Sequence, residues 1–237
     1  MIIEKNKFID LFSSAGITVS DEQYQKFLIY SDMLVDWNNK CNLTAILDPE
    51  GITIKHFYDS IFPFMNIEIP QNAKLIDVGT GAGFPSVPLA LMKIDLKLTL
   101  LDSLNKRINF LSDLTNTLDI NAECVHGRAE EFGQKADFRE KFDIATARAV
   151  ASLPELCEYC LPFVKVGGYF VSLKGSNGLE EFSSSYNAIS TLGGEIVEKK
   201  SYTLPNNDGR TLVVIKKISH TPTKYPRNKG QMTKKPL

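Results

Sequence analysis

The stretch LIDVGTGAGFPSVPLAL at residues 75–91 constrains the fold of this chain more than any other segment. An apolar run typical of a buried strand leads into three alternating glycines, Gly79, Gly81 and Gly83, and a helical pattern follows. Glycines in such a loop permit positive φ angles and let a ligand approach the backbone with no Cβ in the way. The next apolar run ends at Asp102, and an acid about 20 residues beyond such a loop suits the diol of a ribose. The sequence therefore predicts a site for a nucleoside-containing cofactor.

The spacing of the glycines distinguishes between cofactors. Dinucleotide-binding loops follow G-x-G-x-x-G, whereas this loop reads D-x-G-x-G-x-G, with Asp77 in front and Phe84 in the sixth place. That form is typical of S-adenosylmethionine methyltransferases, whose cofactor has no pyrophosphate. An acid at the loop also suits the cationic amino group and sulfonium of that cofactor. We therefore expect S-adenosylmethionine, with NAD or a glycine-rich turn that binds nothing as the alternatives.

Strands and helices alternate regularly from about residue 70, which predicts a parallel sheet with helices on both faces. The expected strands cover residues 74–78, 96–101, 122–126, 142–147 and 167–175. Two further β-rich runs, 195–204 and 211–218, are joined by a turn-rich connection and predict a hairpin. A parallel sheet that ends in an antiparallel hairpin is the layout of class I methyltransferases. We therefore predict an α/β fold with this Rossmann-like sheet, flanked by helices, and a small helical extension at the N-terminus.

Three parts of the chain are expected. Residues 1–66 form the N-terminal helical extension, with Ser20 and Gln23 as a capping box. Residues 67–218 form the methyltransferase domain, and residues 219–237 form a flexible basic tail. From Lys216 to the end there are seven Lys or Arg and no acid, although the whole chain carries a net charge of −1. We expect the tail to be a mobile arm that contacts phosphates without affecting the cofactor, or else a solubilising extension.

Cofactors of open α/β sheets bind at the carboxyl ends of the strands. Asp102 follows the second expected strand, Ala129 and Glu130 follow the third, and Arg148 follows the fourth. We expect Asp102 to hold the ribose hydroxyls, Ala129 and Glu130 to border the adenine, and Arg148 to read the target. Alternatively, Arg148 pairs with Glu130 or Asp102. His56 and Asp59, in the N-terminal part, are expected to be hydrogen-bonded scaffold residues rather than ligands.

The tip of the fourth strand also restricts the methyl acceptor. Amino-methyltransferases of nucleic acids place an acid or amide, Pro-Pro and an aromatic residue there, whereas this chain has Ala147-Arg148-Ala149. No cysteine is suitably placed for pyrimidine C5 methylation. A purine ring nitrogen such as guanine N7 remains, because its lone pair needs only to be positioned in line with the methyl group. N7 is inaccessible in A-form RNA, so the target would lie in a loop or distorted region.

Composition argues against a metal site and a membrane span. Cys157 and Cys160 form one C-x-x-C inside a leucine-rich helix, without the second pair that a zinc site requires. No apolar run approaches the ~20 residues of a membrane span, and no signal-peptide core follows Met1. We therefore expect a cytoplasmic protein without metal or membrane contact, while the oligomeric state cannot be predicted.

An ordered set of motifs along essentially the whole chain resembles the RsmG family, also called glucose-inhibited division protein B. The motifs are LIDVGTGAGFPSVPLA, LDSLNKRINFL, GRAEEF, TARAVASL, LKG and DGRTLVVIKK, with NLT at 42–44 and HFYDSI at 56–61. The resemblance implies methyl transfer from S-adenosylmethionine to N7 of a specific guanine in 16S ribosomal RNA of the small subunit, without a general base. It also implies cofactor contacts at Gly79, Phe84, Ala129, Glu130 and Arg148.

Together, these observations give a set of expected cofactor-binding residues: Gly79, Gly81, Phe84, Asp102, Ala129, Glu130 and Arg148. No catalytic residue is assigned, although Arg148 is a candidate for positioning the substrate. A methyltransferase acting on a small molecule and a non-catalytic RNA- or nucleotide-binding module stay open as alternatives. Basic residues near the expected active edge favour RNA, namely Lys106, Arg107, Arg128, Arg148 and Lys174.

Overall fold

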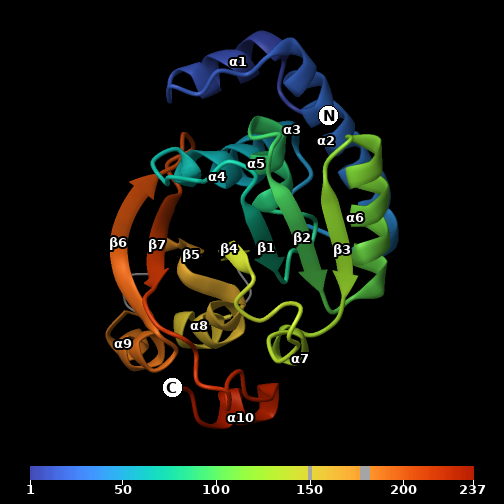
Figure 1. The fold of residues 1–237 in the computed structure, drawn as a ribbon. Helices are drawn as coiled ribbons and strands as arrows, with labels where there is room; N and C mark the ends of the chain where they lie inside the picture. The colour runs from blue at the N-terminus through green and yellow to red at the C-terminus, as the bar shows by residue number, and fades with distance from the viewer. Residues whose placement is uncertain (149–150, 177–181) are drawn as a thin grey trace.

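The computed structural model describes residues 1–148, 151–176 and 182–237, and a seven-stranded sheet lies at its centre (Figure 1). The strand order is β3-β2-β1-β4-β5-β7-β6. The strands are β1 (Lys74–Val78), β2 (Lys97–Asp102), β3 (Ala122–His126), β4 (Phe142–Arg148), β5 (Val164–Gly175), β6 (Gly194–Thr203) and β7 (Gly209–Lys217). Strand β7 runs antiparallel to β5 and β6, and the other pairs are parallel. The predicted α/β methyltransferase sheet with its terminal hairpin is confirmed.

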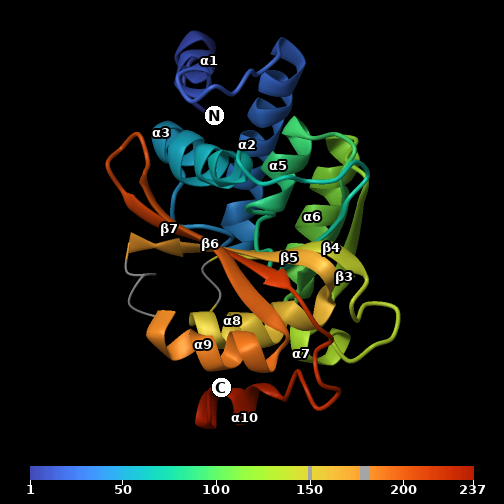
Figure 2. The same cartoon turned by 60° about the vertical axis from the view of Figure 1, so that its left-hand side comes forward.

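Helices cover both faces of the sheet. Figure 2 shows α1, α2, α3, α5 and α6 on one side and α7, α8, α9 and α10 on the other. Their bounds are α1 (Lys5–Ser13), α2 (Asp21–Cys41), α3 (Pro49–Gly51), α4 (Asp59–Ile61), α5 (Ser86–Met92), α6 (Asn105–Thr117), α7 (Ala129–Phe132), α8 (Leu153–Cys160), α9 (Phe182–Thr191) and α10 (Lys229–Lys234). A π-helix, η1 (Ile52–Tyr58), lies between α3 and α4, and the 3₁₀ segments are η2 (Phe62–Phe64) and η3 (Leu161–Phe163).

The alternation of side chains along the strands produces two hydrophobic cores, one on each face. Leu75 on β1 belongs to the core beneath α2, α5 and α6, together with Phe27 and Phe110. The next residue, Ile76, belongs to the opposite core, which includes Leu156 of α8. The central strand β1 is therefore buried on both faces, as expected for a parallel sheet covered by helices, whereas the edge strands β3 and β6 are largely exposed.

The N-terminal helices share a core with the sheet. Ser20 caps α2 in the predicted capping box with Gln23, and Pro49 occupies the first turn of α3 as expected. Phe57 of η1 is fully buried in the same core as Leu75 of β1. The boundary predicted at residue 66 therefore separates segments of sequence that pack as one hydrophobic unit.

The C-terminal segment 219–237 differs from the predicted flexible tail, because the structure packs it against α7 and α8. Tyr225 is 6% exposed and Met232 is fully buried, both within the core that contains α8. Asn228 caps α10 by accepting a hydrogen bond from the Gln231 N–H at 2.9 Å. The lysines that suggested a mobile arm lie on a folded segment in which Tyr225 and Met232 are buried.

The sequence predicted neither a metal site nor a membrane span. Across the described ranges, no three His, Cys, Asp or Glu side chains come together as metal ligands would. None of the helices in those ranges has the length and apolar character needed to span a bilayer. Cys157 and Cys160 are both fully buried on α8, as two small apolar residues would be.

Candidate functional site

A cavity of about 410 Å³ lies at the carboxyl ends of β1, β2 and β3, a size typical of small-molecule sites. Strand ends, two helices and the C-terminal segment contribute to its wall. The lining residues are Val78, Gly79, Leu101, Asp102, Ser103, Gly127, Arg128, Ala129, Glu130, Ala151, Glu155, Tyr159, Lys229 and Thr233. Four of the predicted cofactor-binding residues, from the ends of three strands, therefore meet around one cavity.

The loop after β1 presents the backbone of Gly79 to this cavity, whereas Gly81 is not among the described lining residues. Gly79 and Gly81 have φ angles of +69° and +61°, in the left-handed region that strongly favours glycine. The Gly79 N–H donates to the Leu101 carbonyl oxygen at 2.8 Å, which ties the loop to β2. A Cβ at Gly81 would meet no described atom nearer than the Gly79 carbonyl oxygen at 4.0 Å. The loop is therefore rigidly placed and leaves open space beside Gly81.

Asp77, just before the loop, is a fully buried acid. Its Oδ2 accepts hydrogen bonds from the Thr80 and Ser86 hydroxyls, while its Oδ1 has no partner among the described atoms. Burial raises the pKa of Asp77 to about 7, although the Ser86 and Thr80 hydrogen bonds act in the opposite direction. An unsatisfied carboxylate oxygen in a buried position favours a nearby cation. This chemistry fits the cationic amino group and sulfonium of the expected cofactor.

Asp102 is held in one orientation at the end of β2. Its Oδ1 accepts from the Leu104 N–H at 2.9 Å, and its Oδ2 accepts from the Gly81 N–H at 3.0 Å and from Arg107 at 3.3 Å. The carboxylate is 2% exposed and lines the cavity. Because each carboxylate oxygen has two lone pairs, Oδ1 retains one for a hydroxyl donor.

Ala129 and Glu130 begin α7, directly after β3 and a single turn. The Glu130 carboxylate lies 3.7 Å from the Arg128 guanidinium, and Arg107 is the ion-pair partner of Asp102. The alternative in which Arg148 pairs with Glu130 or Asp102 is therefore wrong, since the acid paired with Arg148 is Asp59.

Phe84 and Arg148 lie together, but neither belongs to the described wall of the cavity. The Arg148 guanidinium carbon lies 4.9 Å from the centre of the Phe84 ring. Arg148 Nη1 donates to the Lys55 carbonyl oxygen at 3.2 Å and lies 3.8 Å from the Asp59 carboxylate. The end of β4 therefore directs Arg148 toward η1. Ala149, the next residue of the predicted strand tip, is outside the described residues.

The Phe84 ring is stacked between aromatic neighbours of the N-terminal helices. The His56 and Tyr30 rings lie 4.5 and 5.3 Å from it, each inclined by 13°. His56 Nε2 lies 3.0 Å from the Thr44 hydroxyl and 3.3 Å from the Ile46 carbonyl oxygen. Burial, followed by the charge of Arg148, lowers the pKa of His56 to about 4, so the imidazole is neutral at pH 7.

Asp59 is buried beside this stack and carries a network of three partners. Its Oδ2 accepts from Arg210 Nε at 2.8 Å, and its Oδ1 accepts from the Tyr202 hydroxyl at 3.1 Å. Together with Arg148, these contacts satisfy the carboxylate. The hydrogen bonds of His56 and Asp59 agree with their interpretation as scaffold residues.

Sequence reasoning missed the residues that α8 and α10 contribute to the cavity. Glu155 and Tyr159 lie four residues apart on α8, a spacing that places them on one helix face. Lys229 and Thr233 of α10 show the same spacing. The spacing of four residues is visible in the sequence and predicts a shared helix face. The neighbouring residues do not show which face of the sheet either helix covers.

A family model described as rRNA small subunit methyltransferase G, GidB, matches residues 23–208. The chain belongs to this family. The resemblance to the RsmG family predicted from the motifs is thereby confirmed.

Relatives of similar length support the assignment. A "Ribosomal RNA small subunit methyltransferase G" of Alkaliphilus metalliredigens is 52% identical over 224 residues, which cover 94% of each chain. A protein of the same name from Streptococcus pneumoniae is 46% identical over 232 residues, covering 97% of this chain and 98% of that one.

Solved structures with low sequence identity share the fold of this RsmG family member. Geranyl diphosphate methyltransferase in complex with SAM superposes with a TM-score of 0.55 at 12% identity, covering 68% of this chain and 85% of that chain. The Methanococcus jannaschii fibrillarin pre-rRNA processing protein gives a TM-score of 0.51 at 18% identity, covering 64% of this chain and 71% of that chain. Both likenesses concern the fold alone.

Proposed function

We propose that this chain transfers a methyl group from S-adenosylmethionine to N7 of one guanine in the 16S ribosomal RNA of the small subunit. The observation that carries the proposal is the meeting of Gly79, Asp102, Ala129 and Glu130 around one cavity at the carboxyl ends of three strands. Relatives that cover nearly the whole chain are named for ribosomal RNA methylation. N7 of guanine is the acceptor that the RsmG resemblance implies.

When bound, S-adenosylmethionine supplies an electrophilic methyl group on its sulfonium. Asp102 accepts hydrogen bonds from the ribose hydroxyls, and Ala129 and Glu130 border the adenine. Gly79 and Gly81 leave room for the cofactor at the loop. These roles follow from the strand ends at which each residue lies.

Phe84 and Arg148 lie beyond the loop, where the methionine end and the target base would approach. Arg148 is the candidate for positioning the guanine. Neutral His56 is buried against Phe84 and is not needed as a base, because N7 presents a lone pair without losing a proton. Catalysis then depends on the alignment of N7 with the methyl group.

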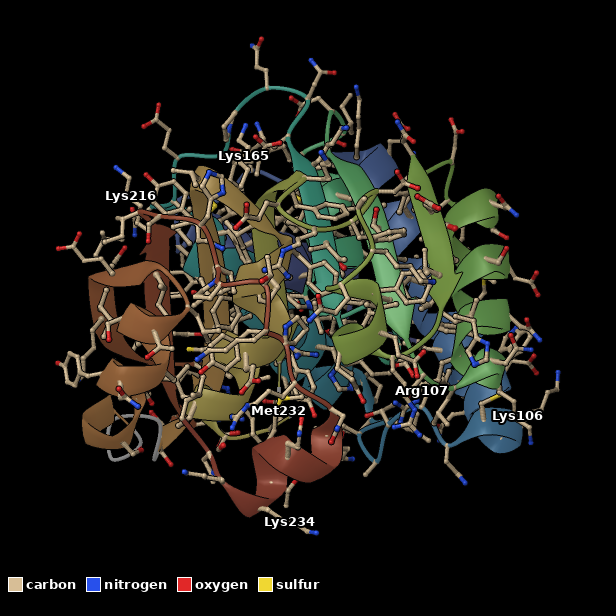
Figure 3. All side chains as sticks on the ribbon, turned by 60° about the horizontal axis from the view of Figure 1, so that its bottom comes forward. Lys106, Arg107, Lys165, Lys216, Met232 and Lys234 are labelled. Carbon is tan, nitrogen blue, oxygen red and sulfur yellow. The ribbon has the colours of Figure 1, made fainter. Side chains whose placement is uncertain are left out.

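Basic side chains around the cavity support an RNA substrate. Figure 3 shows Lys106 and Arg107 on one side and Lys234 on the other, viewed toward the carboxyl ends of the strands. Three of the expected basic residues also have partners within the protein. Lys174 Nζ donates to the Ala151 carbonyl oxygen at 2.7 Å, Arg107 lies 3.3 Å from Asp102, and Arg148 lies 3.8 Å from Asp59. An RNA of the small subunit as substrate implies that the protein works in the cytoplasm.

The proposal is tested with methyl-labelled S-adenosylmethionine and small ribosomal subunits from a strain that lacks this gene. We expect label at a single guanine N7 of 16S RNA. Subunits from the parent strain, already methylated, form the matched control and should accept no label. Label only in a small-molecule extract would instead indicate a small-molecule methyltransferase. Cofactor binding without transfer to any substrate would indicate a non-catalytic RNA-binding module.

A further inference from the structure

The C-terminal segment closes one side of the cavity that the proposed function assigns to the cofactor. The chain leaves β7 and passes beneath α7 and α8 before ending near α10, the red helix at the bottom of Figure 1. Lys229 and Thr233 of α10 line the cavity together with Asp102, Ala129 and Glu130. A segment expected to be remote from the cofactor therefore forms part of its wall.

A bidentate ion pair between Arg227, just before α10, and Glu158 of α8 anchors α10 to α8. Arg227 Nε and Nη2 donate to the two oxygens of the Glu158 carboxylate at 2.8 and 2.6 Å, and the Arg227 N–H donates to the same group at 2.8 Å. Glu158 is 1% exposed, so this charge-assisted pairing is shielded from water. Arg227 Nη1 also donates to the Lys235 carbonyl oxygen at 2.9 Å, just past the end of α10. One guanidinium thus holds both ends of the helix.

A second anchor fixes the chain that leads into α10. Arg139 donates to the carbonyl oxygens of Thr221 and Tyr225 at 2.7 and 2.8 Å, and Gln134 donates to that of Pro226 at 3.0 Å. A Cβ on Gly133, just after α7, would lie 2.9 Å from the Pro226 ring. The segment is therefore packed directly against the end of the helix that carries Ala129 and Glu130.

The other lining residues indicate which end of the cofactor α10 faces. Asp102 and Ser103 come from the end of β2, and Ala129 and Glu130 come from the end of β3. Phe84 and Arg148 do not belong to the described lining. The wall formed by α10 is therefore on the ribose and adenine side of the site, not on the methionine side.

We infer that Lys229 and Thr233 are further cofactor-binding residues that contact the nucleoside end, and that Arg227 is a positioning residue that holds them there. This inference rests on the proposed placement of S-adenosylmethionine in the cavity. It reverses the expectation that the C-terminal segment is dispensable for cofactor binding.

The test measures the Kd of two ligands by titration calorimetry: S-adenosylmethionine, and 5′-methylthioadenosine, which lacks the amino-acid end. We expect the double change Lys229→Ala and Thr233→Ala to raise both Kd values by the same factor, about tenfold. Lys235→Ala, an exposed lysine of the same segment that does not line the cavity, is the matched control and should leave both unchanged. A loss confined to S-adenosylmethionine, or wild-type affinity in the double variant, would overturn the inference.

Arg227→Ala tests the positioning role. If Arg227 acts through α10, combining it with the Lys229 and Thr233 changes should raise the Kd no further than the larger single effect, because the contacts are already lost. A general loss of folding would instead add to the effect of the double variant and would refute the role. Absence of cofactor binding in the unaltered protein would count against the proposed function itself, which is a separate outcome.

Discussion

The Asp59 carboxylate and the Arg210 guanidinium, 151 residues apart in sequence, lie 2.8 Å from each other in the interior. Asp59 is 5% exposed and Arg210 is 18% exposed. Arg148 reaches the same carboxylate from the end of β4, at 3.8 Å. One acid on the N-terminal helices thus holds two arginines of the sheet.

Removal of this acid should destabilise the protein strongly. Asp59→Asn removes the buried carboxylate that Arg148 and Arg210 share, and leaves Arg210 only the more exposed Asp208 carboxylate at 3.8 Å. We expect this change to lower the free energy of unfolding by about 3–5 kcal/mol. Urea denaturation measures the change. The control is Asp36→Asn, because the Asp36 carboxylate is 69% exposed and lies 3.3 Å from Lys40 Nζ. An exposed pair of this kind contributes less than about 1 kcal/mol, so equal losses in the two variants would contradict the assigned role of Asp59.

The buried His56 should make the protein sensitive to acid. Its folded pKa, lowered by burial from 6.5 to about 4, means that the unfolded chain binds more protons between these values. The free energy of unfolding therefore falls as the pH drops from 6.5 to 4, by about 3 kcal/mol from this group. His56→Gln should remove this slope, whereas His126→Gln, at an exposed position, should not. Unfolding curves at pH 7, 5.5 and 4.5 distinguish the two.

The buried Asp77 should make the folded protein less stable as the pH rises, which is opposite to the effect of His56. Its folded pKa, raised by burial from 3.8 to about 7, means that the folded chain binds more protons in this window. Stability from this group is present below pH 4 and is lost as the pH rises to 7. We expect Asp77→Asn to gain stability over the unaltered protein by about 4 kcal/mol between pH 4 and pH 8. A stability difference that stays constant with pH would contradict the shift.

The glycine loop can be tested by one β-branched substitution. Gly79→Val should abolish S-adenosylmethionine binding, because it adds a side chain at φ +69° on the wall of the cavity. Gly16→Val carries the same backbone strain at φ +75°, with no described atom within 4 Å of its Cβ. Calorimetry measures the S-adenosylmethionine affinity of both folded variants. It thereby distinguishes an effect of backbone strain on the fold from the loss of space for the cofactor. Normal affinity in Gly79→Val would show that the loop does not border the cofactor.

The basic residues of α10 and its end should contribute to RNA binding through phosphate contacts. Replacing Lys234 and Lys235 by Gln should reduce the slope of log K against log salt concentration by about 1 to 2, since each phosphate contact contributes about 0.7–0.9. The affinity for S-adenosylmethionine should not change. The same replacement at Lys5 and Lys7 of α1, at the opposite end of the molecule (Figure 1), is the control. Identical slopes in all three proteins would exclude phosphate contacts at Lys234 and Lys235.

Features encoded by neighbouring residues could be predicted well from the sequence. Strand β1 has the predicted bounds, because its apolar run and the glycines that end it are local signals. The position of Asp102 at the carboxyl end of β2 could be predicted for the same reason, because an apolar run ends at this residue.

The direction of Arg148 could not be predicted in this way. Its neighbours along the chain show that it ends a strand, but its side chain is directed by Phe84, by Asp59 and by the Lys55 carbonyl oxygen. Two of these three, Asp59 and Lys55, lie on the N-terminal helices, 89 and 93 residues away. Long-range packing decides the orientation.

The C-terminal segment was misjudged because its composition is polar and basic. Two isolated apolar residues, Tyr225 and Met232, gave no periodic pattern, yet both are buried. The pairing of Arg227 with Glu158 joins residues 69 positions apart. Composition describes the average residue of a segment, whereas anchoring here depends on three particular side chains.

The position of β7 between β5 and β6 has a consequence for synthesis on the ribosome. The chain emerges with its N-terminus first, so β6 appears before the strand that must separate it from β5. Until residues 209–217 have left the exit tunnel, β5 has an unpaired edge and Asp59 has no Arg210. Lys229 and Thr233 are translated later still. The wall that Lys229 and Thr233 add to the cavity therefore forms only after all strands of the sheet have been translated, and a nascent chain truncated before residue 229 lacks it.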